Sequence, residues 1–159
     1  MWRIARQGED DAIVGMCLEL YREDPGPVAV TDAQIRKTLA VLRREPVRGR
    51  AVVCELEDRP IGYALLVAFW SNELGGEICE VDELFVMRDH RSQGHGRALF
   101  AAIERGEVWP APPVAIALGV TPGNARARRL YEGLGFRAVG TNMVRRAALT
   151  PEKDGGLAG

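Results

Sequence analysis

Apolar residues recur along this chain with two different periods, and the change between them marks the predicted elements. Residues 9–21 and the segment after Thr31 carry apolar side chains three and four positions apart, which predicts two helices with one buried face each. Thr31 and Gln34 form a capping box at the start of the second helix. Residues 51–56 and 61–70 are apolar and β-prone around a polar turn, which predicts a β-hairpin.

The second half of the chain alternates predicted strands with predicted helices. Strands are expected at 77–86, 114–120, 136–139 and 143–147, in addition to a first strand at 2–6. One helix ends before the prolines of residues 109–113, and another begins at Asn124 and ends at Gly135. The pattern indicates an α/β domain over residues 1–150, followed by a disordered, glycine-rich tail at 151–159.

Composition narrows the class of protein. With 159 residues, 47% of them hydrophobic, the chain can bury one core, so we expect a single domain. The net charge of −1 argues against nucleic acid as a partner, although Arg126, Arg128 and Arg129 lie close together. No apolar run is long enough to span a membrane and no signal peptide is visible, so we expect a cytoplasmic protein that does not bind a membrane. The three cysteines lack metal-binding spacing, which predicts buried thiols and no metal site.

A glycine-rich turn joins the strand at 77–86 to the next helix and carries candidate chemistry. Arg91 is followed by Gly94 and Gly96 at the expected helix N-terminus, where backbone N–H groups can point at one anion. The guanidinium of Arg91 adds donors suited to phosphate oxygens. A Walker loop is excluded because Arg97 follows the last glycine, and a dinucleotide fingerprint is excluded because Leu99 stands where it needs glycine or alanine.

The pattern Arg91-x-x-Gly94-x-Gly96 resembles the phosphate loop of the GNAT superfamily of acyl-CoA-dependent N-acyltransferases. A second stretch, from Asn124 to Phe136, is similar to the Asn-x-x-Ala-x-x-Leu-Tyr-x-x-x-Gly-Phe segment of the same family. The resemblance extends from the first strand to the region of residue 143. It implies a mixed, mostly antiparallel sheet flanked by helices and splayed between two central strands.

The resemblance also implies a set of residues that bind acetyl-CoA as cosubstrate. The backbone groups of the strand end would pair with the pantetheine arm, the glycine-rich loop would hold the pyrophosphate, and Asn124 is a further contact or only a helix cap. The cofactor-binding residues expected on this basis are Leu84, Phe85, Val86, Arg91, Gln93, Gly94, His95, Gly96, Arg97 and Asn124.

Three side chains are expected to take part in catalysis. Tyr131 falls where the family often places a tyrosine near the CoA sulfur, and a protonated tyrosine can donate to a departing thiolate; the alternative is an aromatic residue that only packs. Glu80 and Asp82 lie at positions that assist amine deprotonation in several family members. Strict alternation places both on one face of the strand and Glu83 on the other, unless a bulge intervenes. The alternative is a solvated strand face.

These observations predict an N-acetyltransferase that moves an acetyl group from acetyl-CoA to a small-molecule primary amine by direct attack in a ternary complex. Direct attack is favoured over an acyl-enzyme because none of the cysteines lies in either motif. Two alternatives stay open: a non-catalytic acyl-CoA-binding or regulatory module, and an acetyltransferase that acts on a protein N-terminus or lysine. The sequence leaves a homodimer open.

Overall fold

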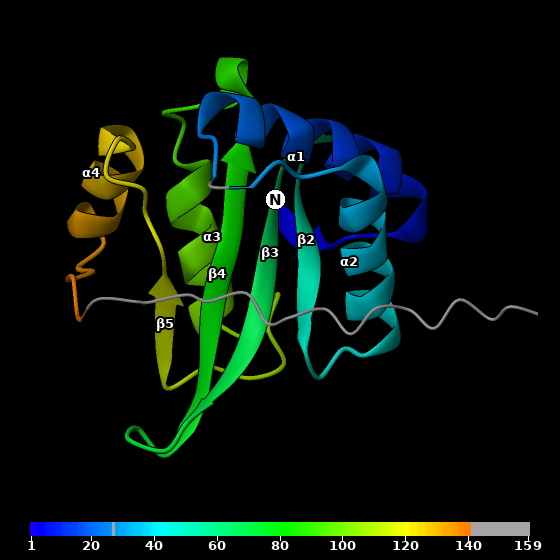
Figure 1. Cartoon of the computed structure of the whole chain (residues 1–159). Coiled ribbons are helices and arrows are strands. Elements are labelled where there is room, and N and C mark those ends of the chain that lie inside the picture. The colour runs from blue at the N-terminus through cyan, green and yellow to red at the C-terminus, as the bar shows by residue number, and fades with distance from the viewer. Residues whose placement is uncertain (27, 141–159) are drawn as a thin grey trace, which may run out of the picture.

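In the described part of the chain, five strands form one central sheet (Figure 1). The computed structural model describes residues 1–26 and 28–140. The elements are β1 (Trp2–Ile4), η1 (Gln7–Glu9), α1 (Asp10–Glu23), α2 (Asp32–Arg44), β2 (Gly49–Leu56), β3 (Arg59–Ser71), β4 (Gly76–Val86), η2 (Arg88–His90), α3 (His95–Glu104), β5 (Ala115–Leu118) and α4 (Ala125–Gly133). The strands lie in the order β1-β2-β3-β4-β5, antiparallel except for β5, which runs parallel to β4.

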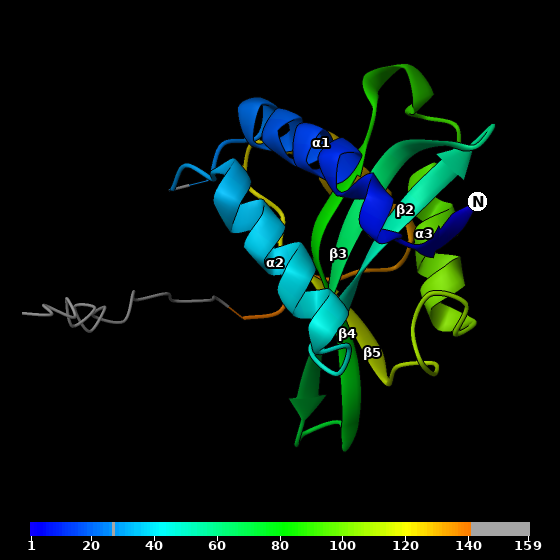
Figure 2. The same ribbon diagram turned by 90° about the vertical axis from the view of Figure 1, so that its right-hand side faces the viewer.

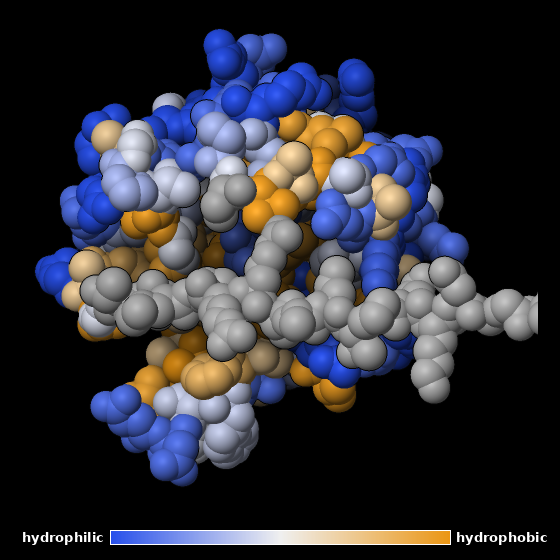
Figure 3. All heavy atoms as spheres, viewed as in Figure 1, coloured by the Kyte–Doolittle hydropathy of each residue, from blue (hydrophilic) through white to orange (hydrophobic). Residues whose placement is uncertain are grey.

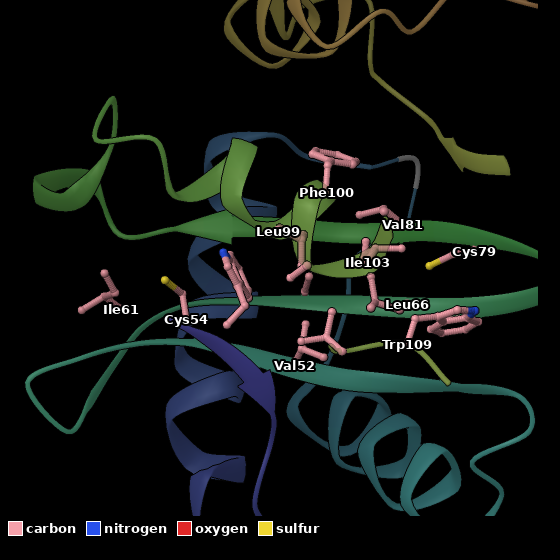
Figure 4. Packing of buried hydrophobic residues seen from close by; sticks show 14 residues of the cluster. Val52, Cys54, Ile61, Leu66, Cys79, Val81, Leu99, Phe100, Ile103 and Trp109 are labelled. Atoms are coloured by element: carbon pink, nitrogen blue, oxygen red, sulfur yellow. The ribbon is translucent and has the colours of Figure 1, made fainter. Parts of the chain in front are cut away.

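Helices cover both faces of this sheet. Figure 2 shows α1 and α2 on one side and α3 on the other. Each side has its own hydrophobic cluster, because alternate residues of β2, β3 and β4 point to opposite faces. On the α3 side, Leu99 and Ile103 lie over Leu66 and Val52 of the strands (Figure 4). The mixed, mostly antiparallel sheet between helical layers confirms the predicted fold class.

The first helical pair follows the sequence pattern closely. The Thr31 hydroxyl accepts a hydrogen bond from the Gln34 amide at 3.3 Å, and the Gln34 side chain accepts from the Thr31 amide at 2.9 Å. The apolar positions Ile35, Leu39 and Leu42 are buried against the sheet. This capping box fixes the start of α2 and therefore the position of the loop between the two helices.

The N-terminal strand is tied to the body by an ion-pair cluster. The guanidinium of Arg3 contacts Glu9 at 2.5 Å and also bonds Glu55 on the neighbouring strand. These bonds lower the pKa of both carboxyls. The adjacent Trp2 is buried, and its indole Nε1 donates to the His95 carbonyl at 2.8 Å. The N-terminal strand is thus hydrogen-bonded to the first residue of α3.

One predicted strand departs from the expected arrangement, and two other predictions fall on residues that the structure does not describe. Residues 136–139 are irregular rather than a strand: Phe136 is held by ring contacts with Phe100 and Tyr131 and not by a strand ladder. The strand expected at 143–147 and the tail at 151–159 lie outside the described residues.

The β3–β4 hairpin projects beyond the helices (Figure 1). Figure 3 shows hydrophobic residues at the surface where it leaves the body, and Phe69, Trp70 and Leu74 are exposed there.

The cysteines behave as the sequence predicts. Cys17, Cys54 and Cys79 are buried free thiols. None of the helices in the described part of the chain is long and apolar enough to cross a bilayer.

Candidate active site

The sheet opens beyond the end of β5, where β4 continues past the last residue that pairs with it. The two strands pair from Ile78 with Ala115 to Val81 with Leu118, and beyond that point β4 continues to Val86 without a partner on β5. A cavity of about 750 Å³ lies at this opening. Its walls come from the end of β4, the glycine-rich loop, the start of α3 and one side of α4. The splay expected between the central strands is therefore present, with a cavity at its mouth.

The glycine-rich loop places the N-terminus of α3 in the cavity wall. Ser92 and Gly94 have φ angles of +62° and +86°, so the chain turns in the left-handed region just before the helix begins at His95. Gly94 caps the helix without a side-chain bond, and the first N–H groups of an α-helix have no intrahelical acceptor. Donors with a partial positive charge are therefore available to an anion at this end of the cavity.

Gly96 is needed for a different reason from Gly94. A Cβ built on Gly96 would meet the Leu130 side chain of α4 at 2.8 Å. The absent side chain therefore lets α3 and α4 approach closely beside the cavity. The loop expected from the sequence is present, but its second glycine serves helix packing as well as access to the backbone.

The structure places Arg91 in the cavity wall with its donors partly occupied. Its Nε donates to the Val86 carbonyl at 2.6 Å, its Nη2 contacts Glu23 at 2.8 Å, and its guanidinium lies 5.1 Å from the centre of the Phe85 ring. Arg91 thus links the end of β4 to α1 in addition to bringing a positive charge. Gln93, another residue predicted to bind the cosubstrate, is exposed, lies outside the lining and donates to a backbone carbonyl.

Other predicted cosubstrate residues gather around the same cavity. The lining includes Leu84, Phe85, Val86, Arg91, Gly94, His95, Gly96, Arg97 and Asn124. Arg126 also lines it, although the sequence offered only a run of arginines there. Burial and the neighbouring Arg91 guanidinium lower the pKa of Arg126. Arginine stays protonated in proteins, so this wall is cationic and suited to phosphate groups.

Asn124 and Tyr131 both come from the second sequence motif but differ in their surroundings. The Asn124 Oδ1 accepts from the Ala127 amide at 3.0 Å, as a helix cap does, and its Nδ2 donates to Asp24 at 2.9 Å. Tyr131 is half-buried and packs edge-on against Phe100. Burial raises the pKa of the Tyr131 hydroxyl, which keeps it protonated.

A second cavity of about 410 Å³ adjoins the first and shares Tyr131 with it. Among the described residues, its lining holds three carboxylates, from Asp24, Asp82 and Glu83, and no arginine, lysine or histidine. The first cavity is lined by three arginines, Arg91, Arg97 and Arg126, and by two carboxylates: Glu23, which pairs with Arg91, and Asp24, which lines both cavities. Arginines thus outnumber carboxylates in the first cavity, whereas the described lining of the second is acidic, and Tyr131 is among the residues that the two share.

A β-bulge decides which acids of β4 reach this second cavity. Leu65 of β3 pairs with Glu83 and Leu66 pairs with Val81, so Asp82 is the extra residue. The bulge interrupts the alternation that would have placed Glu83 on the face opposite Glu80 and Asp82. Glu80 is exposed and lies outside the lining of both cavities. Asp82 is also exposed, but unlike Glu80 it lines the second cavity. Partial removal of its carboxyl from water in that cavity, together with the Glu83 and Glu80 carboxylates, raises the pKa of Asp82.

Glu83 is held by three donors from two sides. Tyr21 of α1 donates to Oε1 at 2.8 Å, Tyr63 of β3 donates to Oε2 at 2.7 Å, and the Cys17 thiol lies 3.6 Å from Oε2. Burial and the Glu83 carboxylate raise the pKa of both tyrosines. Sequence reasoning named neither tyrosine, because their convergence depends on the bulge and on the packing of α1. Among residues 1–26 and 28–140, no three metal-ligating side chains come together.

Comparison with known proteins identifies the family of the chain and its fold. A sequence model described as the acetyltransferase (GNAT) family matches residues 14–136. An uncharacterised N-acetyltransferase of Methanocaldococcus jannaschii is 36% identical over 86 residues, and the match covers 53% of this chain and 37% of that protein. The chain thus spans little more than a third of the length of that relative.

Solved structures show the same fold at low sequence identity. A possible acetyltransferase from Clostridium difficile 630 superposes with a TM-score of 0.75 at 22% identity, covering 94% of this chain and 97% of that one. An aminoglycoside N-acetyltransferase in complex with CoA gives a TM-score of 0.70 at 17% identity, covering 94% and 95%. A ribosomal-protein-alanine N-acetyltransferase from Brucella melitensis biovar Abortus 2308 gives 0.70 at 16%, covering 92% and 98%.

Proposed function

The chain belongs to the GNAT family of acetyltransferases, and we propose that it transfers an acetyl group from acetyl-CoA to a small primary amine within a ternary complex. One observation carries this proposal: a cationic cavity and an acidic cavity meet at Tyr131 beside the splayed strands. An anionic cosubstrate suits the first cavity and a cationic acceptor suits the second.

The first cavity offers a partner for each part of acetyl-CoA. The N-terminus of α3 and the Arg126 guanidinium would hold the phosphates. The end of β4, residues 84–86, pairs with β3 on one side and has no partner on β5, so its backbone groups on that side would meet the pantetheine amides as an added strand would. The Val86 carbonyl is the exception, because it already accepts from Arg91. The thioester would then lie near Tyr131, at the join with the second cavity.

The proposed reaction has one nucleophilic step and three proton transfers. Asp82 accepts a proton from the ammonium form of the acceptor, and the raised pKa of this carboxyl favours that role. The neutral nitrogen then attacks the thioester carbonyl carbon, so a C–N bond forms and the C–S bond breaks. Tyr131 donates its proton to the departing thiolate and regains one from the nitrogen, which loses its second proton as the amide forms. Glu80 lies outside both linings, so we assign it no step.

Direct attack is favoured because the cysteines are poorly suited to carry an acyl group. Burial raises the pKa of the Cys17 and Cys79 thiols to about 12. Few thiolates would form at neutral pH, and the thiolate is the reactive species. No cysteine lines either cavity.

The test is continuous thiol detection with acetyl-CoA against a panel of small amines, with a lysine-containing peptide and an alanine-terminated peptide alongside. Amine-dependent thiol release with a matching mass increase on a small amine supports the proposal. Acetylation of a peptide alone would instead indicate a protein acetyltransferase. Tight CoA binding with no thiol release for any acceptor would favour a binding module.

A further inference from the structure

We propose that Glu83 binds the ammonium form of the acceptor amine and that Tyr21 and Tyr63 are positioning residues that orient its carboxylate. This inference rests on the proposed function, because it assigns the acceptor's place within the second cavity. It concerns a residue that the alternation of β4 had placed on the opposite face from Glu80 and Asp82. Three observations support the inference together: the hydrogen bonds of the Glu83 carboxylate, the bulge at Asp82 and the lining of the second cavity.

The bulge at Asp82 brings Glu83 to the α1 face of the sheet. Without the extra residue, Glu83 would share a face with Val81, which packs in the cluster under α3. With it, Phe85 packs in the cluster under α1, and Glu83 contacts Tyr21 of the same helix. A charged side chain therefore sits beside an apolar cluster and also lines the second cavity.

The hydrogen bonds leave the carboxylate one open acceptor position. A carboxylate has about four lone-pair sites. Oε2 accepts from the Tyr63 hydroxyl and from the Cys17 thiol, whereas Oε1, among residues 1–26 and 28–140, accepts only from the Tyr21 hydroxyl. The open position is thus on Oε1, whose one donor belongs to a side chain that lines the cavity together with Glu83.

The two hydroxyls approach from opposite sides and fix the carboxylate. Tyr63 is fully buried within β3, and Tyr21 is half-buried on α1. A carboxylate that is held before binding loses little freedom when it meets an ammonium. The acidic neighbours Asp82 and Asp24 strengthen the attraction for a cation, and no positive side chain among the described lining residues competes for the carboxylate.

The experiment uses 1,4-diaminobutane as the cationic probe and 1,4-butanediol, of equal length and no charge, as its control. Calorimetry measures the binding of both to the full chain, with and without CoA. We expect saturable binding of the diamine and none of the diol. Glu83→Gln should weaken diamine binding by about tenfold to a hundredfold, the loss of one charge-assisted bond, and leave CoA affinity unchanged.

Matched variants separate recognition from a structural role. Glu19→Gln removes a carboxylate from the same helix as Tyr21 but outside both linings, and should bind the diamine as the wild type does. Tyr63→Phe and Tyr21→Phe keep the Glu83 charge and should each weaken diamine binding by several-fold. In turnover, all three changes at the Glu83 network should raise KM for the amine more than KM for acetyl-CoA.

Several outcomes overturn the inference. These are wild-type affinity for the diamine in folded Glu83→Gln, an equal loss in Glu19→Gln, no saturable diamine binding to the wild type, or parallel losses of diamine and CoA affinity. If Glu83→Gln does not fold, the diamine affinity of Tyr21→Phe tests the inference instead. Unchanged diamine affinity in that variant would overturn the inference. Absence of CoA binding would overturn the proposed function instead, because the diamine titration does not depend on CoA.

Discussion

Replacing Asp82 by asparagine tests the proton acceptor, because it removes the basic oxygen and keeps the shape of the side chain. An amine with a pKa of about 10.4 is neutral in only about one molecule in 2,500 at pH 7. A positioned general base contributes roughly 10²- to 10⁴-fold, which is about 3–5 kcal/mol of activation free energy. We expect kcat/KM of Asp82→Asn at pH 7 to fall by an amount in that range.

The loss should shrink in base because more acceptor then arrives without its proton. Between pH 7 and pH 9.5 the neutral fraction of such an amine rises roughly 300-fold. The variant's kcat/KM should therefore climb about tenfold per pH unit over this range, whereas the wild-type profile should be flatter. The ratio of wild type to variant is thus predicted to fall by up to about 300-fold between pH 7 and pH 9.5, and to approach one where the loss at pH 7 is no larger than that.

Asp82→Asn should lower activity at pH 7 without lowering the stability of the fold. The pKa of Asp82 is raised in the folded protein, so the folded state binds this proton more tightly than the unfolded chain does. Stability from such a group falls as the pH rises from the unfolded pKa through the folded pKa, and at pH 7 the ionised carboxylate is unfavourable. Asp82→Asn should therefore unfold at the same or a higher temperature than the wild type at pH 7.

The assay is thiol release with the best acceptor of the amine panel from pH 6.5 to 9.5, with Glu80→Gln measured in parallel and thermal unfolding recorded at pH 7. A variant profile that stays parallel to the wild type, with no recovery in base, would rule out the proton-acceptor role. An equal or larger fall in kcat/KM for Glu80→Gln would indicate that Glu80, which lies outside both cavity linings, is the proton acceptor.

Three further predictions address the cosubstrate, the leaving group and the fold. Gly96→Asp should abolish CoA binding measured by calorimetry, because its Cβ meets Leu130 at 2.8 Å and its charge repels phosphate; a folded variant with unchanged affinity would remove the phosphate-loop assignment. Tyr131→Phe should keep CoA affinity and slow acetyl transfer by roughly 10²- to 10⁴-fold, and turnover within twofold of the wild type under rate-limiting chemistry would make it a packing residue. Arg3→Met should lower the unfolding temperature at pH 7 but much less at pH 3. Its partners Glu9 and Glu55 have lowered pKa values in the folded protein, so the stability that their charges contribute is lost as the pH falls through those pKa values. An equal fall in unfolding temperature at pH 7 and pH 3 would contradict this.

The sequence predicted those parts of the fold that depend on local pattern. The capping box at Thr31 and the buried positions of α2 follow from spacing alone, and the structure has both. The strand expected at 136–139 was wrong because its evidence was a short apolar run, and tertiary contacts of Phe136 decided that segment instead. A short run carries little information about whether a neighbouring strand is there to pair with it.

The candidate site was harder to predict because two of its determinants are not local. The alternation of β4 is readable in the sequence, but the bulge at Asp82 depends on the register with β3, and it transfers Glu83 to the other face. Likewise, the loop motif predicts Arg91 as a phosphate ligand, whereas its bonds to Val86 and Glu23 arise from packing. Motifs locate the loop; the partners of each side chain are set by the whole fold.

The division of charge between the two cavities gives the site a direction. A free acetyl-CoA brings several negative charges and suits the wall with Arg126, and an acceptor ammonium suits the wall with Asp82 and Glu83. An anionic cosubstrate is disfavoured in the second cavity, because its phosphates would meet carboxylates without a described cationic partner. Under the proposed function, the reacting carbon and nitrogen would meet at the shared boundary, where Tyr131 stays protonated and the carboxyl of raised pKa lies on the acceptor side. Reversing one wall, for instance by Glu83→Lys, should abolish amine-dependent turnover and leave CoA binding intact, and retained turnover would show that the charge division does not place the acceptor.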